Sequence, residues 1–451
     1  MSTTAERIIV ADEKSPQSES SAKSRDGATL SPKLREVQLG EENLPIAELP
    51  IGKHIAEVAR HYKHAAGKSD TYSPEVVDMI YHMSREGDMS DAAIRQFVAA
   101  KLAAEVEQPA GSPQATWDQL VFLSANLTRL VIDPYREKCN SEVSLGPDRA
   151  RPLRLAWPIV TGGVDFAQLP EQVLAAFAAG TAASDLALMI SAAQLSSLPT
   201  GGVSAIAVVD VDEPPPELAR AAAVEISAAR ADLLTAEKVA AALAAIHEQT
   251  GGAIPVGVVA PAECARRVVD ETIDLELDFY VADAQWTEVA RPSGPLPEAT
   301  AGPAIRVLAD TVDRLRHHCR EETRQVVYRG GIRDGADAGK AICCGATAVT
   351  IGLAGVVGLG HKLTELKDEA TLLEKLAAPL DDADAARRLA NVAKSVAIEV
   401  TMLARACGKS SVTNMEPEDL RSMSIAASEA TGIPLAGRDI QFRRYGENGQ
   451  A

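Results

Sequence analysis

Residues 326–352 read VVYRGGIRDGADAGKAICCGATAVTIG, and this segment decides the expected fold. An apolar run at 326–328 is followed by a glycine pair, Gly330 and Gly331. A helical stretch then leads to a second apolar run at 348–351, which ends in Gly352. Strand, short loop, helix and strand in this order form the repeating unit of a parallel sheet.

Apolar runs of the same kind recur on the N-terminal side of this segment. Together with the two runs above they make eight candidate strands, at 158–161, 186–190, 205–209, 224–226, 254–259, 279–281, 325–328 and 348–351. Nearly all are joined by a stretch with helical character. An open doubly wound sheet uses the same alternation, but eight repeats favour a closed α/β barrel, the (β/α)8 or TIM barrel.

Composition along the chain divides it into four regions. Residues 1–45 form a polar tail with too little apolar surface to fold, and residues 46–115 form a helical N-terminal region and a linker. The barrel occupies residues 116–375, and residues 376–451 form a helical C-terminal extension and tail. In the second region, Ser73 before Pro74 predicts the start of a helix.

The overall charge of the chain argues against binding to nucleic acid. The chain has 451 residues, and its 45 Lys and Arg against 63 Asp and Glu give a formal net charge of −18. Such an acidic surface repels phosphate backbones, so we expect no nucleic-acid partner.

The N-terminus has no apolar signal-peptide core, and no stretch reaches the roughly 18 apolar residues of a membrane span. We therefore expect a cytoplasmic protein without a membrane partner.

The six cysteines are scattered and form no Cys-x-x-Cys pair. A disulfide framework is unusual in a domain of this size, and the spacings of metal sites are missing. The sequence therefore predicts reduced, mostly buried cysteines and no metal site.

The glycines after the last two predicted strands suggest a binding site. The loops at this point of a barrel commonly hold a phosphate group, and glycine lets backbone N–H groups approach it closely. On this interpretation Gly330, Gly331 and Gly352 form the cradle, with Ile332 and Arg333 beside it. The alternative is that the glycines form tight turns at strand ends with no ligand.

The glycine-rich run at 330–352 resembles the FMN-phosphate site of the flavin barrels. Other segments resemble the FMN-binding domain of the glutamate synthase large subunit and its stand-alone relatives, including the catalytic subunit of N-methylglutamate synthase. They are segments 117–123, 135–140 and 152–155, and the C-terminal segments 403–409, 416–420 and 431–437. The resemblance covers about residues 116–440. It implies FMN as the cofactor, bound by Gly330, Gly331, Ile332, Arg333, Gly352 and Asp283.

The middle of the chain departs from that family. Val209 and Val259 stand where the family has lysines, and Asp165 stands in a turn where the family has a serine. A lysine beside a flavin stabilises its reduced anion, so these exchanges remove a large electrostatic contribution to catalysis. The family's cysteine cluster is absent from 353–362, so we expect no iron–sulfur cluster.

Two functions follow from the resemblance. The first is a catalytically degenerate barrel that works as a structural or regulatory partner, in a homo- or hetero-oligomer with a related glutamate synthase-like subunit. It would keep the phosphate or FMN-phosphate site, with or without bound FMN. The second is an active FMN-dependent oxidoreductase of the class that acts on CH–NH2 donors. It would form glutamate, or an N-substituted glutamate, from 2-oxoglutarate and an amino-group donor. The losses in the middle of the chain favour the first, and no catalytic residue is assigned.

Overall fold

The computed structural model describes residues 36–39, 42–45, 71–88, 115–125, 138–199, 201–299, 304–361 and 369–437. Most of the predicted polar tail and of the predicted region 46–115 lies outside these residues. Within the tail, β1 (Glu36–Leu39) pairs with β2 (Glu42–Pro45) in an antiparallel ribbon. This ribbon belongs to one compact unit, and residues 66–89 and 111–451 form the other.

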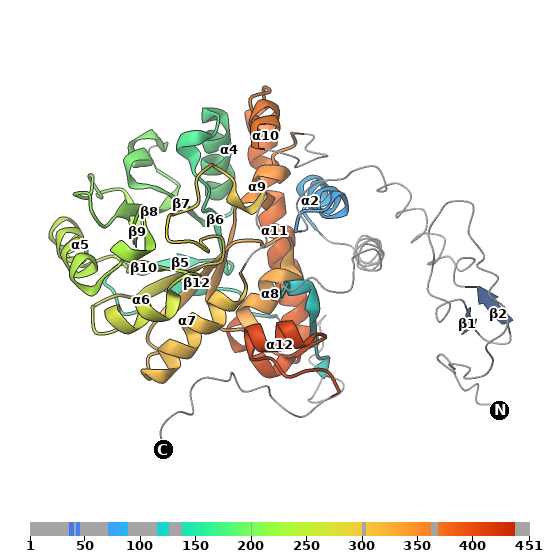
Figure 1. Cartoon of the computed structure of the whole chain (residues 1–451). Helices are drawn as coiled ribbons and strands as arrows, with labels where there is room; N and C mark the ends of the chain where they lie inside the picture. The colour runs from blue at the N-terminus through green and yellow to red at the C-terminus, as the bar shows by residue number, and fades with distance from the viewer. Residues whose placement is uncertain are drawn as a thin grey trace, which may run out of the picture. The chain divides into compact units, whose positions relative to one another are not determined.

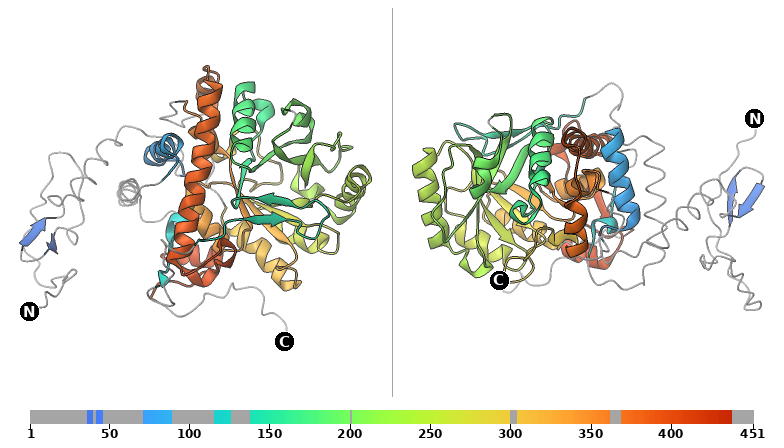
Figure 2. Two further views of the ribbon diagram at one scale, coloured as in Figure 1. Left: turned by 180° about the vertical axis from the view of Figure 1, so that it is seen from behind. Right: turned by 90° about the horizontal axis from the view of Figure 1, so that it is seen from above.

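Eight parallel strands close into a barrel, as predicted. The strands are β6 (Ile159–Gly162), β7 (Ala187–Ser191), β8 (Ser204–Asp210), β9 (Ala221–Ser227), β10 (Val256–Pro261), β11 (Phe279–Asp283), β12 (Gln325–Arg329) and β13 (Ala348–Ile351). Each pairs with the next along the chain, and β13 pairs with β6 to close the ring (Figures 1 and 2). All eight predicted strands are confirmed.

Helices join most, but not all, of these strands. The crossovers are α4 (Glu171–Ala182), α5 (Ala236–Thr250), α6 (Ala265–Thr272), α7 (Arg306–His317) and α8 (Gly335–Cys343). Between β7 and β8 there is only the 3-10 helix η6 (Ala192–Ser197). Residues 211–220, with three consecutive prolines, connect β8 to β9 without an α-helix. Proline has no N–H and blocks a helix interior, which explains why this crossover stays extended.

A small hairpin packs at the amino ends of the strands. It consists of β4 (Val143–Leu145) and β5 (Leu153–Leu155). Arg149 in its turn donates to Asp278 at 2.8 Å, and the Gly146 amide donates to the side chain of Gln325 at 3.0 Å. Both partners lie at the amino ends of β11 and β12, so the hairpin is fastened to the end of the barrel opposite the functional face described below.

Elements from both ends of the folded unit cover one side of the barrel. The long helix α11 (Asp382–Ala406) packs against α4, α8 and α2 (Pro74–Glu86) (Figure 1). Ser73 caps α2 as predicted, because its hydroxyl accepts a hydrogen bond from the Val76 amide. The remaining elements are β3 (Leu120–Phe122), which pairs with β14 (Leu420–Ser422), and α9 (Leu353–Gly358), α10 (Glu369–Leu376) and α12 (Ile425–Thr431).

All six cysteines are free, and three of them are buried. Among the described residues, no helix is both long and apolar enough to cross a lipid bilayer.

Close packing of α4 on α11 makes Gly180 sensitive to substitution. A Cβ on Gly180 would lie 2.8 Å from the Ala386 carbonyl oxygen and 2.9 Å from Leu389 Cβ. In an unobstructed helix, Gly to Ala stabilises by about 0.5–1 kcal/mol. Here we expect Gly180→Ala to lower the free energy of unfolding by roughly 1–3 kcal/mol, measured by urea denaturation. The control, Ala179→Leu on the exposed neighbouring position, should change it by less than about 0.5 kcal/mol. A stabilised Gly180→Ala variant would contradict the packing.

Candidate functional site

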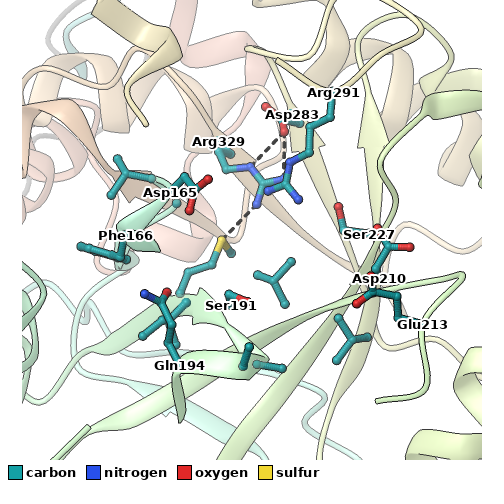
Figure 3. Close-up of a pocket in the computed structure, with 18 of the residues that line it drawn as sticks. Asp165, Phe166, Ser191, Gln194, Asp210, Glu213, Ser227, Asp283, Arg291 and Arg329 are labelled. Atoms are coloured by element: carbon teal, nitrogen blue, oxygen red, sulfur yellow. Dashed lines mark hydrogen bonds and ion pairs between the residues drawn. The ribbon is translucent and has the colours of Figure 1, made fainter. Parts of the chain in front are cut away.

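A cavity of about 430 Å³ opens at the carboxyl ends of the barrel strands. Residues that end a strand, or directly follow one, line it: Gly163, Ser191, Asp210, Ser227, Asp283 and Arg329. Figure 3 shows the Arg329 side chain reaching into this space. In (β/α)8 enzymes the active site lies at this end of the barrel, so the cavity is the candidate site.

Arg329 is a buried cation held by two buried carboxylates. Its guanidinium donates to Asp283 Oδ2 at 2.8 Å and to Glu225 Oε2 at 2.9 Å, and its side chain is only 3% exposed. Burial works to lower the pKa of Arg329, but Asp283 and Glu225 outweigh it and raise that pKa above its ordinary value. The cation is therefore neutralised by the protein itself and joins β12 to β11 and β9.

The lining of the cavity is acidic. Carboxylates line it at four positions and guanidinium groups at two: Asp165, Asp210, Glu213 and Asp283, against Arg291 and Arg329. Figure 3 shows Asp165 on one side of the cavity and Asp210 with Glu213 on another. Arg329 is already paired with carboxylates in the buried cluster. Of the two arginines among the described lining residues, only Arg291 lies outside this cluster. A dianionic ligand would be repelled here.

The predicted glycine loops come together beside the cavity. Gly330 and Gly331 follow β12 with φ of +122° and +66°, a backbone conformation that favours glycine. Gly352 follows β13, and a Cβ there would lie 2.8 Å from Glu298 Oε1 and 3.2 Å from the Gly162 carbonyl oxygen. We call the space between these loops the cradle, and the group inside it is the carboxylate of Glu298.

Glu298 belongs to the short 3-10 helix η8 (Pro297–Ala299) in the loop between β11 and α7. The Tyr72 hydroxyl donates to Oε2 at 2.7 Å, and the Gln285 amide nitrogen lies 2.7 Å from Oε1. The backbone amides of Gly331 and Leu353 donate to the same carboxylate. Burial raises the pKa of Glu298 to about 7, while the hydrogen bonds from Tyr72 and the two amides oppose that rise.

The other residues predicted to bind the cofactor are engaged elsewhere. Arg333 donates to Asp337 at 2.6 Å and, through both terminal nitrogens, to Asp118 at 2.7 and 2.8 Å. Asp283 accepts hydrogen bonds from the Arg329 guanidinium and from the backbone N–H of Gln285. Ile332 is buried, with 1% of its surface exposed. Gly330, Gly331 and Gly352 are therefore brought together, whereas Arg333 and Asp283 belong to separate ion-pair clusters.

An FMN phosphate does not fit the cradle in this arrangement. The amides of Gly331 and Leu353 are donors of the kind that a phosphate oxygen needs, but both are satisfied by Glu298. A second anion at the same donors would lie against a buried carboxylate, which is strongly unfavourable. Glu298 and a phosphate group therefore exclude one another.

The two valines that replace family lysines differ in position. Val209, 3% exposed, lines the cavity near the end of β8. Val259 is fully buried in β10. Neither contributes charge to the site.

Sequence reasoning missed Glu298, Gln285, Tyr72 and Glu225. Glu225 carried a signal, because a glutamate inside the apolar run AAAVEIS requires a buried partner. Glu298 and Tyr72 are 226 residues apart and follow no periodic pattern, so nothing local connected them.

Comparisons with known proteins find similarity to FMN-dependent dehydrogenases and to glutamate synthases. A family model described as FMN-dependent dehydrogenase matches residues 299–374. A glutamate synthase large subunit-like protein of Rhizobium meliloti (strain 1021) is 26% identical over 391 residues, covering 71% of this chain and 87% of that protein. The archaeal-type glutamate synthase (NADPH) of Thermotoga neapolitana is 30% identical over 222 residues, 46% of this chain and 43% of that protein. The chain thus spans less than half of the latter.

Solved structures of similar fold include mandelate oxidase with benzoyl-formic acid, at 16% identity and a TM-score of 0.49, covering 77% of this chain and 97% of that one. The flavin-binding domain of baker's yeast flavocytochrome b2 matches at 14% identity and a TM-score of 0.48, covering 83% and 95%.

Closed topology defines a (β/α)8 barrel, and residues 299–374 of this barrel are similar to the FMN-dependent dehydrogenase family. More narrowly, the chain is similar in sequence to a glutamate synthase large subunit-like protein and to archaeal-type glutamate synthases, in line with the resemblance of its motifs.

The raised pKa of Glu298 predicts how stability changes with pH. Below about pH 4.5 the group is protonated in both the folded and the unfolded chain, whereas between about 4.5 and 7 only the folded chain keeps the proton. As the pH rises through this window, the free energy of unfolding of the wild type should fall relative to that of Glu298→Gln, by on the order of 3 kcal/mol. Urea denaturation of both proteins at several pH values measures this. A difference that stays constant with pH would contradict the assigned burial.

Proposed function

We propose that this chain is a glutamate synthase-like barrel without catalytic turnover, which serves as a structural or regulatory partner of a related catalytic subunit. The resemblance to a glutamate synthase large subunit-like protein over 87% of that protein's length supports the choice of partner class. Retention of a complete barrel supports a role that depends on shape.

The paired state of Arg329 is the observation that carries this proposal. A site for 2-oxoglutarate must attract a dicarboxylate, yet Asp283 and Glu225 already neutralise this buried cation. Several of the remaining lining side chains are carboxylates. The field of the cavity therefore opposes both the substrate and a reduced flavin anion, where catalysis would need stabilisation of negative charge.

The apolar character of Val209 supports the same conclusion. In the family a lysine stands at this position, and here the side chain that lines the cavity has neither charge nor a hydrogen-bond donor. The cradle that would hold an FMN phosphate is filled by Glu298. Each of these features removes a different contribution to flavin chemistry.

We expect the purified chain, supplied with FMN, 2-oxoglutarate, ammonium and an electron donor, to form essentially no glutamate. Two lost electrostatic groups of about 3 kcal/mol each correspond to on the order of a ten-thousandth of a competent enzyme's rate. Glutamate formation is measured beside a competent glutamate synthase as positive control. Introducing Val209→Lys and Val259→Lys together should not restore activity, because Arg329 stays neutralised. Robust turnover by the wild type would overturn the proposal in favour of an FMN-dependent oxidoreductase.

The partner role predicts a physical complex. Co-expressed with a related glutamate synthase-like catalytic subunit, the chain should co-elute with it in size-exclusion chromatography and alter its activity or thermal stability. An unrelated (β/α)8 protein of similar size is the control. Separate elution with unchanged activity and stability would contradict the partner role.

A further inference from the structure

The cradle between the glycine loops already contains a carboxyl group of the chain itself, which is ionised above about pH 7. Four donors from three separate parts of the chain converge on the Glu298 carboxylate: Tyr72 and Gln285 through their side chains, and Gly331 and Leu353 through their backbone amides. Glu298 is only 4% exposed. Among the described residues no lysine or arginine pairs with it, so neutral donors alone replace its hydration.

The space in the cradle is shaped for this carboxylate. A side chain at Gly352 would collide with Glu298 Oε1 at 2.8 Å, and one at Gly330 would lie 2.9 Å from Gln285 Cγ. Two of the three predicted cradle glycines are therefore explained by Glu298 and by the residue that donates to it. Neither glycine requires an external ligand while Glu298 is in place.

Glu298 occupies this position from a loop and not from a barrel strand. It lies in η8, between the end of β11 at Asp283 and the start of α7 at Arg306. Withdrawal of this side chain would break hydrogen bonds to the loops but no strand pairing. It would also leave two backbone amides unsatisfied at the cradle, and these are donors that a phosphate oxygen satisfies well.

We propose that Glu298 is an internal ligand of the cradle, and that a phosphate group, such as that of FMN, binds at Gly331 and Leu353 only when the Glu298 carboxylate has left. The carboxylate thus holds the barrel in a state closed to phosphate. The inference concerns anion binding and does not require that the chain be inactive.

The test compares FMN with riboflavin, which has the same ring system without the phosphate. Dissociation constants are measured by fluorescence titration at pH 8 for the wild type, for Glu298→Ala and for Glu288→Ala, an exposed glutamate of the same loop. The quantity of interest is the ratio of the riboflavin constant to the FMN constant. Because two freed backbone donors become available, this ratio should rise at least about tenfold in Glu298→Ala and stay unchanged in Glu288→Ala.

A second measurement uses inorganic phosphate alone. Phosphate should raise the melting temperature of Glu298→Ala and leave the wild type and Glu288→Ala unaffected. If Glu298→Ala does not fold, Glu298→Ser, whose side chain is also too short to reach the two backbone amides, is judged by the same two criteria. A ratio that is unchanged in the variant, or the absence of any phosphate effect on it, would overturn the proposal.

These outcomes are separate from the test of catalysis. A Glu298→Ala variant that gains phosphate binding and stays inactive supports both proposals. Glutamate formation by the wild type would refute the proposed function, and the ratio of the two dissociation constants would still decide the role of Glu298.

Discussion

The buried ion cluster around Arg329 is the interaction on which the mouth of the barrel depends. A guanidinium keeps its proton at any ordinary pH, so burying it requires carboxylates close by. Asp283 and Glu225 supply them from β11 and β9, at 2.8 and 2.9 Å. The cluster links strands across the barrel and neutralises the buried cation that lines the cavity. The remaining carboxylates of the lining, Asp165, Asp210 and Glu213, then leave the cavity with an acidic character.

The same requirement, with the sign of the charge reversed, governs the neighbouring cradle. A buried carboxylate needs donors, and the two loops after β12 and β13 provide backbone amides at the right place. Tyr72, just before α2, adds a hydroxyl, so a segment outside the barrel contributes to the site. The backbone amides of the cradle can donate to a carboxylate oxygen or to a phosphate oxygen. In this structure the chain itself supplies the carboxylate of Glu298.

Two charged side chains of the glycine-rich segment make contacts that hold the architecture together. Arg333 binds Asp118 and Asp337, and the Lys340 ammonium donates to the Trp117 carbonyl oxygen at 2.8 Å. These contacts fasten the segment before β3 onto α8. The family resemblance of the motif is therefore compatible with a different use of its side chains, since function depends on the site and not on the fold.

The sequence by itself determined the eight strands, the start of α2 at Ser73 and the glycine turns after β12 and β13. These features depend on local patterns: apolar runs, a capping hydroxyl, and backbone conformations open to glycine. Only the tertiary structure decided that Arg329 pairs with Glu225 from 104 residues away and that Glu298 meets Tyr72 across 226 residues. Contacts between such distant residues depend on how the barrel closes, and no local pattern encodes them.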